Sequence, residues 1–132
     1  MSESYISTEL RRLVVTRAQR RCEYCLIHEE DTFFGFQIDH IISEKHGGET
    51  MADNLAQACA TCNAKKGSDI ATLENGLLVA FFNPRTDVWS EHFRFDGPRI
   101  DGLTLVGLAT ARLLGFNHPR RIEERRASMS LK

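Results

Sequence analysis

The chain has 132 residues, of which 42% are hydrophobic and 27% are charged, and its formal net charge is −1. This composition is typical of a soluble protein, and the length suits one compact domain. No apolar run reaches the roughly 18–20 residues that cross a bilayer, and the first residues show no secretory signal. We therefore expect a cytoplasmic protein without a membrane partner, in a reducing setting where its four cysteines are more often metal ligands than disulfides.

Short apolar segments alternate with polar loops in the first half of the chain. Ser7 or Thr8 suits the N-cap of a helix, and Gly47-Gly48 is a turn signal. The run FFGFQIDHII looks like a buried strand. The expected elements are a helix to about residue 19, a tight turn at 22–25, a strand over about 33–42, a loop over 43–54, a short strand or turn over 55–58, and a helix that starts near a second tight turn at 59–62.

The second half predicts a hairpin and two further helices. Its aromatic cluster at 88–95 has strand spacing, which favours the core over a base-stacking surface. The expected elements are a helical extension over 70–75, an apolar segment ended by Asn83-Pro84, a hairpin of 88–95 with the segment after the Gly-Pro turn, a helix from a Thr104 cap to about 114 with core residues Leu105, Leu108, Leu113 and Leu114, and a last helix capped by Asn117 with Pro119 in its first turn. These elements predict an α+β fold.

Charge is distributed unevenly along the chain. Residues 10–21 carry five arginines and no acid, residues 22–58 carry eight acids and one lysine, and the last twenty residues are again rich in arginine. Basic ends of this kind can contact the phosphates of a nucleic acid, although any one arginine can equally lie on a solvated helix face. The candidate nucleic-acid-binding residues are Arg11, Arg17, Arg20, Arg21, Arg121 and Arg125.

The four cysteines form two C-x2-C pairs, Cys22 with Cys25 and Cys59 with Cys62. Each pair lets two thiolates converge on one tetrahedral ion, so the spacing predicts a zinc site with four cysteine ligands. Four protein ligands leave no open coordination position, which makes the predicted zinc structural. Two disulfides or a redox C-x2-C are the rival interpretations, and the spacing alone also suits a zinc ribbon or a RING-like module.

Asp39 and His40 stand side by side within the apolar run. A buried carboxylate is costly unless it is paired or binds a metal, and an imidazole near neutral pH can accept a proton. The whole pattern, C-x2-C…D-H-I…GG…D-N-L…C-x2-C-N-x2-K, resembles the HNH endonuclease family with its ββα-metal motif. The resemblance covers residues 22 to about 67. Asn63 stands at the third signature position, as in the HNN variant of the family.

The resemblance implies a metal-dependent endonuclease that hydrolyses phosphodiester bonds in DNA. Neutral His40 suits the general base, and Asp39 and Asn63 offer hard oxygen ligands to a catalytic Mg²⁺ or Mn²⁺ ion. By resemblance, Asn54 would hold the loop and orient His40. Lys66, one helical turn beyond Asn63, is a candidate to approach the same phosphate. Residues 1–132 would then be one nuclease domain, with the core motif at 22–67 and an extension at 68–132 packed on it.

Two points stay open at the level of sequence. Strict strand alternation sends Asp39 and His40 to opposite faces, so both serve one site only if the strand ends or bulges there. A zinc module that only binds nucleic acid or protein, or a nuclease that acts on RNA, would also carry the cysteines and arginines.

Overall fold

In the computed structural model, which describes residues 5–130, helix α1 (Thr8–Arg17) begins at the predicted cap. The hydroxyl of Ser7 accepts a hydrogen bond of 3.2 Å from the backbone N–H of Leu10. One face of α1 buries Val14, which packs with Leu55 and Ile6 in a small core beside the first hairpin. The first helix is therefore attached to the strand that follows the central loop.

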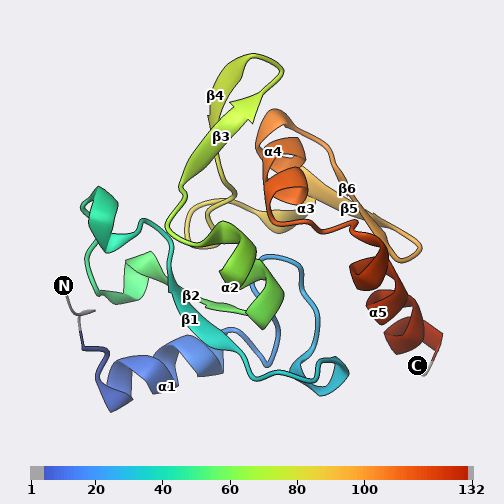
Figure 1. Ribbon diagram of the computed structural model, residues 1–132. Coiled ribbons are helices and arrows are strands. Elements are labelled where there is room, and N and C mark those ends of the chain that lie inside the picture. Colours follow the sequence, from blue (N-terminus) through green and yellow to red (C-terminus); the bar gives the residue numbers. More distant parts are fainter. Residues whose placement is uncertain (1–4, 131–132) are drawn as a thin grey trace.

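A ββα unit forms the centre of the molecule (Figure 1). Strand β1 (Gln37–His40) pairs antiparallel with β2 (Leu55–Ala58), so that Asp39 lies opposite Ala56, and helix α2 (Ala60–Lys66) follows directly. Three short 3-10 helices occupy the connections: η1 (Glu29–Asp31), η2 (Glu44–His46) and η3 (Ala52–Asn54). The predicted short strand is confirmed, and so is the helix expected to start near the second cysteine pair, since Cys59 caps α2 and Cys62 lies within it.

The expected strand over 33–42 is wrong in its length, because only four of its residues have a partner on β2. Phe33 and Phe34 precede the strand in a loop, where Phe33 is 99% exposed. The length of an apolar run therefore overestimates the length of the strand when the partner strand is short.

The second hairpin replaces the helix expected over 70–75. Strand β3 (Ala71–Glu74) pairs with β4 (Leu77–Ala80), and the connecting residues Asn75 and Gly76 have φ angles of 54° and 78°. Positive φ at both central residues is the signature of the Asn-Gly hairpin turn. In Figure 1 this hairpin projects from the rest of the molecule.

The hairpin predicted around the Gly-Pro turn is confirmed for β5 (Phe93–Asp96) and β6 (Arg99–Gly102). The first half of the expected strand over 88–95 is instead the short helix α3 (Trp89–His92). Helix α4 (Leu105–Leu113) is capped by Thr104 as predicted, and Gly115 with φ of 65° follows it.

Helix α5 (Pro119–Ser130) has a different cap from the one expected. The side chain of Asn117 accepts a hydrogen bond from the N–H of Ile100 and donates one to its carbonyl, at 2.9 and 2.8 Å. His118 instead accepts from the N–H of Arg120 at 3.2 Å. Asn117 therefore ties the α4–α5 turn to β6. Within residues 5–130, no helix combines the length and the apolarity of a membrane span.

One hydrophobic core joins the cysteines to the C-terminal half. Phe93 packs against Phe82, Trp89 and Phe116, with ring centroids 5.0–5.5 Å apart. The indole N–H of Trp89 donates to the carbonyl of Tyr24, between the first two cysteines, at 2.8 Å. Leu114 is buried as predicted and Leu113 partly so, whereas Leu105 and Leu108 are exposed, so the expectation that all four lie in the core is wrong for these two.

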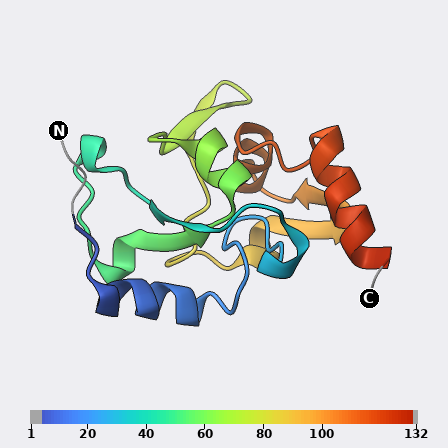
Figure 2. The ribbon, with the colours of Figure 1, turned by 60° about the horizontal axis from the view of Figure 1, so that its bottom comes forward.

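Helices α1 and α5 lie at opposite ends of the molecule (Figures 1 and 2). The two arginine-rich ends of the chain therefore do not form one continuous surface.

Candidate active site and metal centre

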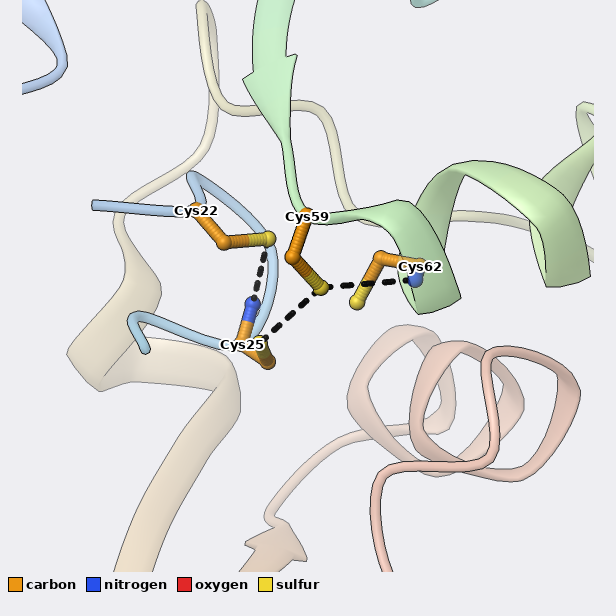
Figure 3. A group of neighbouring side chains, drawn as sticks. All are labelled: Cys22, Cys25, Cys59 and Cys62. Atoms are coloured by element: carbon orange, nitrogen blue, oxygen red, sulfur yellow. Dashed lines mark hydrogen bonds between the residues drawn. The ribbon is translucent and has the colours of Figure 1, made fainter. Parts of the chain in front are cut away.

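Four cysteine side chains converge between the loop after α1 and the start of α2 (Figure 3). Their Sγ atoms all lie within 4.8 Å of one another, and all four residues are buried. Each pair is a tight turn in which an N–H donates to the first sulfur: Cys25 to Cys22 at 3.5 Å and Cys62 to Cys59 at 3.4 Å. The two pairs are thus brought together as the spacing predicts.

The geometry of this cluster fits a tetrahedral metal ion. Zinc–sulfur bonds of about 2.3 Å place neighbouring sulfurs about 3.8 Å apart, and the Sγ atoms of Cys25 and Cys59 are 3.8 Å apart. The four cysteines are free thiols rather than disulfides. Burial raises the pKa of the Cys22 and Cys62 thiols, whereas hydrogen bonds from neighbouring thiols lower the pKa of Cys25 and Cys59. A nearby positive charge would therefore be needed to keep all four as thiolates. These residues are positioned to bind a metal ion.

Arg121 of α5 supplies positive charge next to the cysteines. Its guanidinium donates to Sγ of Cys62 at 3.3 Å and of Cys59 at 3.7 Å, and to the carbonyl of Leu114 at 2.9 Å. Burial alone would lower the pKa of Arg121, but the negative charge on Cys62, Cys25 and Cys59 outweighs it and raises that pKa. The last helix is therefore attached directly to the four-cysteine cluster.

Asp39 points from β1 toward α2 and is buried. Its carboxylate accepts a hydrogen bond of 2.7 Å from the hydroxyl of Tyr24, and the ammonium of Lys66 lies 3.2–3.3 Å from both of its oxygens. Burial raises the pKa of the Asp39 carboxyl above its usual value, although the charge of Lys66 opposes this shift. Burial also raises the pKa of Tyr24 well above its usual value, so its hydroxyl stays protonated and donates.

His40 is the last residue of β1, and its side chain leaves the strand on the other face. Its Nε2 lies 2.9 Å from the hydroxyl of Thr50. Asp39 and His40 nevertheless line the same groove, which has a volume of about 630 Å³. The strand ends at His40, which is the condition under which two consecutive residues can serve one site.

Asn63 completes the groove from the side of α2. Its amide Nδ2 donates to Oε1 of Gln37 at 2.7 Å, which leaves its Oδ1 as the hydrogen-bond acceptor and possible metal ligand. The groove therefore brings together four of the predicted site residues, Asp39, His40, Asn63 and Arg11 of α1.

Asn54 lies behind the groove and holds its loop. Its Oδ1 accepts from the N–H of Ile42 at 2.8 Å, and its Nδ2 donates to the carbonyls of Ile42 and Glu49 at 2.8 and 2.9 Å. Gly48 is required for this closure, because a Cβ there would lie 1.7 Å from the Ile42 carbonyl oxygen. Asn54 thus positions the segment that leads into Thr50, the hydrogen-bond partner of His40.

Lys66 is behind the groove rather than in it. Its side chain is 1% exposed, and its ammonium also donates to the carbonyl of His40 at 3.1 Å. An approach of Lys66 to a phosphate in the groove would require this buried ammonium to leave Asp39.

The oxygen donors of Asp39 and Asn63 are of the type that Mg²⁺ and Mn²⁺ bind in proteins. A divalent ion on Asp39 would share the carboxylate with the ammonium of Lys66. The donor set therefore fits such an ion, and Lys66 would compete with it for the Asp39 carboxylate.

The six candidate arginines differ in what their side chains contact. Arg121 and Arg125 are each 5% exposed, and Arg125 donates to the carbonyls of Pro98 and Phe116. Arg17 donates to the carbonyls of Ala52 and Leu55. The guanidinium groups of these three arginines therefore donate their hydrogen bonds to other groups of the protein.

The remaining candidates reach solvent. Arg11 lines the groove, Arg20 pairs with Glu29 at 2.5 Å, and Arg21 donates to the carbonyl of Leu26 at 2.9 Å. Only Arg11 shares the groove with His40.

Sequence reasoning missed Tyr24 and Thr50 as partners of the site. Tyr24 stands between the first two cysteines, so its position in the chain was a signal that it is held close to the metal centre. Thr50 lies in a polar loop and carries no such signal.

One of three comparisons with known proteins found a match, and it covers the residues of this site. A family model described as HNH endonuclease matches residues 22–69. This segment contains both cysteine pairs, β1, β2 and α2. A comparison with curated proteins and one with solved structures found no match to the chain.

Proposed function

From the HNH endonuclease module at residues 22–69, with its α+β fold and four-cysteine cluster, we propose that the protein is a metal-dependent endonuclease that hydrolyses phosphodiester bonds in DNA. The observation that carries this proposal is the single groove lined by Asp39, His40 and Asn63. These residues come from the end of one strand and from the helix of the same ββα unit.

His40 is the general base of the proposed reaction. Its Nε2 is hydrogen-bonded to the hydroxyl of Thr50, which leaves Nδ1 to take a proton from the attacking water when Nε2 carries the ring hydrogen. Thr50 is then a positioning residue that orients the imidazole ring, and Asn54 holds the loop before Thr50.

Asp39 and Asn63 would hold the catalytic ion, Mg²⁺ or Mn²⁺, by a carboxylate and an amide oxygen. When bound, such an ion supplies Lewis-acid stabilisation of the charge on the scissile phosphate and the leaving oxygen. Tyr24 and Lys66 orient the Asp39 carboxylate by a hydrogen bond and an ion pair. Lys66 is therefore assigned a positioning role in place of a phosphate contact.

The four cysteines hold a structural zinc ion in this proposal. Because the sulfurs occupy all four tetrahedral positions, the zinc has no place for water or substrate. Among the arginines, Arg11 is the one placed to contact a phosphate in the groove, and Arg20 and Arg21 are candidates for more distant phosphate contacts.

A plasmid assay tests the proposed activity. Purified protein is incubated with supercoiled plasmid and Mg²⁺ or Mn²⁺, and in parallel with a structured RNA. Conversion of the plasmid to open circles or linear DNA, lost on addition of EDTA, supports the proposal. Intact plasmid in the presence of zinc-loaded protein contradicts it and favours a binding module, and cleavage of the RNA alone favours an RNA-directed nuclease.

A further inference from the structure

A second hollow, of about 770 Å³, lies between α4, the β5–β6 hairpin and the end of α2. Four cationic side chains line it, Lys65, Arg94, Arg99 and Arg112, together with one acid, Asp101. We name these five residues the basic hollow. A further acid, Glu74, pairs with Arg112 at 2.9 Å. Four cations therefore face two acids in a chain whose net charge is −1.

The arginine side chains of the basic hollow reach solvent, although Arg112 also donates to Glu74 and to the carbonyl of Leu73. The side chains of Arg94, Arg99 and Arg112 are 66%, 52% and 53% exposed. Asp101 lies between two of them, 3.7 Å from Arg94 and 3.8 Å from Arg99. These long contacts hold the guanidinium groups near one another without covering them, which contrasts with the buried Arg121 and Arg125.

Helix α2 connects the basic hollow to the groove that contains His40. Asn63 lines the groove and Lys65 lines the basic hollow. Two residues correspond to about 200° of rotation on an α-helix, so these side chains leave opposite sides of α2. Figure 1 shows α2 in the centre, with β1 and β2 on one side and α4 on the other.

The distance between the two hollows suits a polymer of phosphates. An α-helix with its side chains is about 10–12 Å across, and a DNA strand advances about 3.4 Å per nucleotide. Because the two hollows lie on opposite sides of α2, the strand must pass around the helix, along a path of about half its circumference, or roughly 16–19 Å. A backbone with a phosphate at His40 would therefore reach the basic hollow after about five nucleotides. The groove itself has no excess charge, because Arg11 and Lys45 are balanced there by Asp39 and Glu44.

We propose that the basic hollow binds the sugar–phosphate backbone of the DNA that the groove acts on. This inference rests on the proposed function and adds the surface by which the C-terminal half, residues 68–132, takes part in it. Contacts to phosphates carry no sequence information, so the hollow supplies affinity and orientation and not base recognition.

A binding experiment with matched charge changes tests the inference. The double variant Arg94→Gln/Arg99→Gln removes two cations of the basic hollow. The control Arg12→Gln/Arg126→Gln removes two exposed cations from α1 and α5 and has the same net charge. Both are made in a His40→Ala background to prevent cleavage. Fluorescence anisotropy with a short DNA duplex then gives the dissociation constant over a series of salt concentrations.

We expect the Arg94/Arg99 variant to bind the duplex at least about tenfold more weakly at low salt, with a log–log salt slope that is smaller by about 2. The control should change both quantities much less. Equal losses in the two variants, or unchanged binding in the first, would overturn the inference. A polyglutamate peptide that binds the wild type and not the Arg94/Arg99 variant, while both proteins bind the duplex equally, would also overturn it, in favour of an acidic protein partner.

The plasmid assay separates this inference from the proposed activity. The assay is run with His40 intact. If the Arg94/Arg99 variant cuts plasmid as well as the wild type, the nuclease proposal stands and the DNA-binding role of the basic hollow is rejected. If the wild type binds duplex through the basic hollow but cuts no plasmid, the DNA-binding role of the hollow stands and the nuclease proposal is rejected.

Discussion

The ammonium of Lys66 lies 3.2 Å from Oδ2 of Asp39 and 3.1 Å from the carbonyl oxygen of His40. A cation from the chain itself thus occupies one side of the carboxylate that we propose as a metal ligand. The side chains of both partners are almost fully buried, at 1% and 5% exposure. Each buried charge has lost its hydration shell, and the opposite charge of its partner compensates the free-energy cost of that loss.

Replacing Lys66 by methionine tests this dependence. Lys66→Met leaves a buried carboxylate without its partner, which costs about 3–5 kcal/mol of unfolding free energy. A divalent ion at Asp39 can supply the missing charge, so we expect Mn²⁺ to stabilise the variant more than the wild type. Denaturant unfolding with and without Mn²⁺ measures both effects.

The matched control is Lys65→Met, on the exposed side of the same helix, which should change stability by less than about 0.5 kcal/mol. If Mn²⁺ stabilises the Lys66 variant and the wild type equally, Lys66 does not compete with an ion at Asp39.

His40→Ala separates catalysis from folding. The side chain is partly exposed in the groove and makes one hydrogen bond, to Thr50, so its removal should leave zinc content and melting temperature nearly unchanged. Loss of the base should reduce plasmid cleavage by at least about 100-fold. His46→Ala is the control, because His46 is exposed in the neighbouring η2 and should keep full activity. An active His40 variant would remove the proposed base.

The parts of the site that were predictable are those in which the signal is local. Each C-x2-C pair folds into its own tight turn, and Ser7 and Thr104 cap the helices that follow them. The Asp39-His40 pair is likewise a local pattern within a family motif. Such features depend on residues a few positions apart, so a single sequence contains them.

The parts that were missed depend on distant partners. The predicted strand over 33–42 shortens to β1 because β2 offers only four residues for pairing. Lys66 is buried because Asp39, 27 positions earlier in the chain, lies beside it. Arg121 lies among the cysteines although it belongs to an arginine-rich helix that looks solvated in sequence. The hairpin at Asn75-Gly76 is different. Its Asn-Gly turn signal is local and was present in the sequence, but a helix was expected over 70–75 instead.

Removal of the metal should unfold the centre of the molecule. The four cysteines belong to the main core together with Phe82, Phe93 and Phe116, so the proposed ion would link the loop after α1 to α2 and to the C-terminal half. We expect Cys59→Ala to lose bound zinc and helical circular dichroism together, and a strong chelator to do the same to the wild type. A chelated protein that keeps its melting temperature would show that the core is stable without the ion.

Arg121 should strengthen zinc binding from outside the ligand set. Four thiolates around one Zn²⁺ carry a net charge of −2, and the guanidinium of Arg121 donates to two of the sulfurs. Partners of metal ligands typically contribute about 10–100-fold to metal affinity. We therefore expect Arg121→Met to release zinc to a competing chelator at correspondingly lower chelator concentration, whereas Arg126→Met, exposed on the same helix, should not.

Arg121→Lys should restore part of the affinity, because it keeps the charge but not the two-pronged geometry. If the methionine and lysine variants hold zinc equally well and differ from the wild type only in melting temperature, Arg121 serves packing of α5 against Phe116 and not the metal centre.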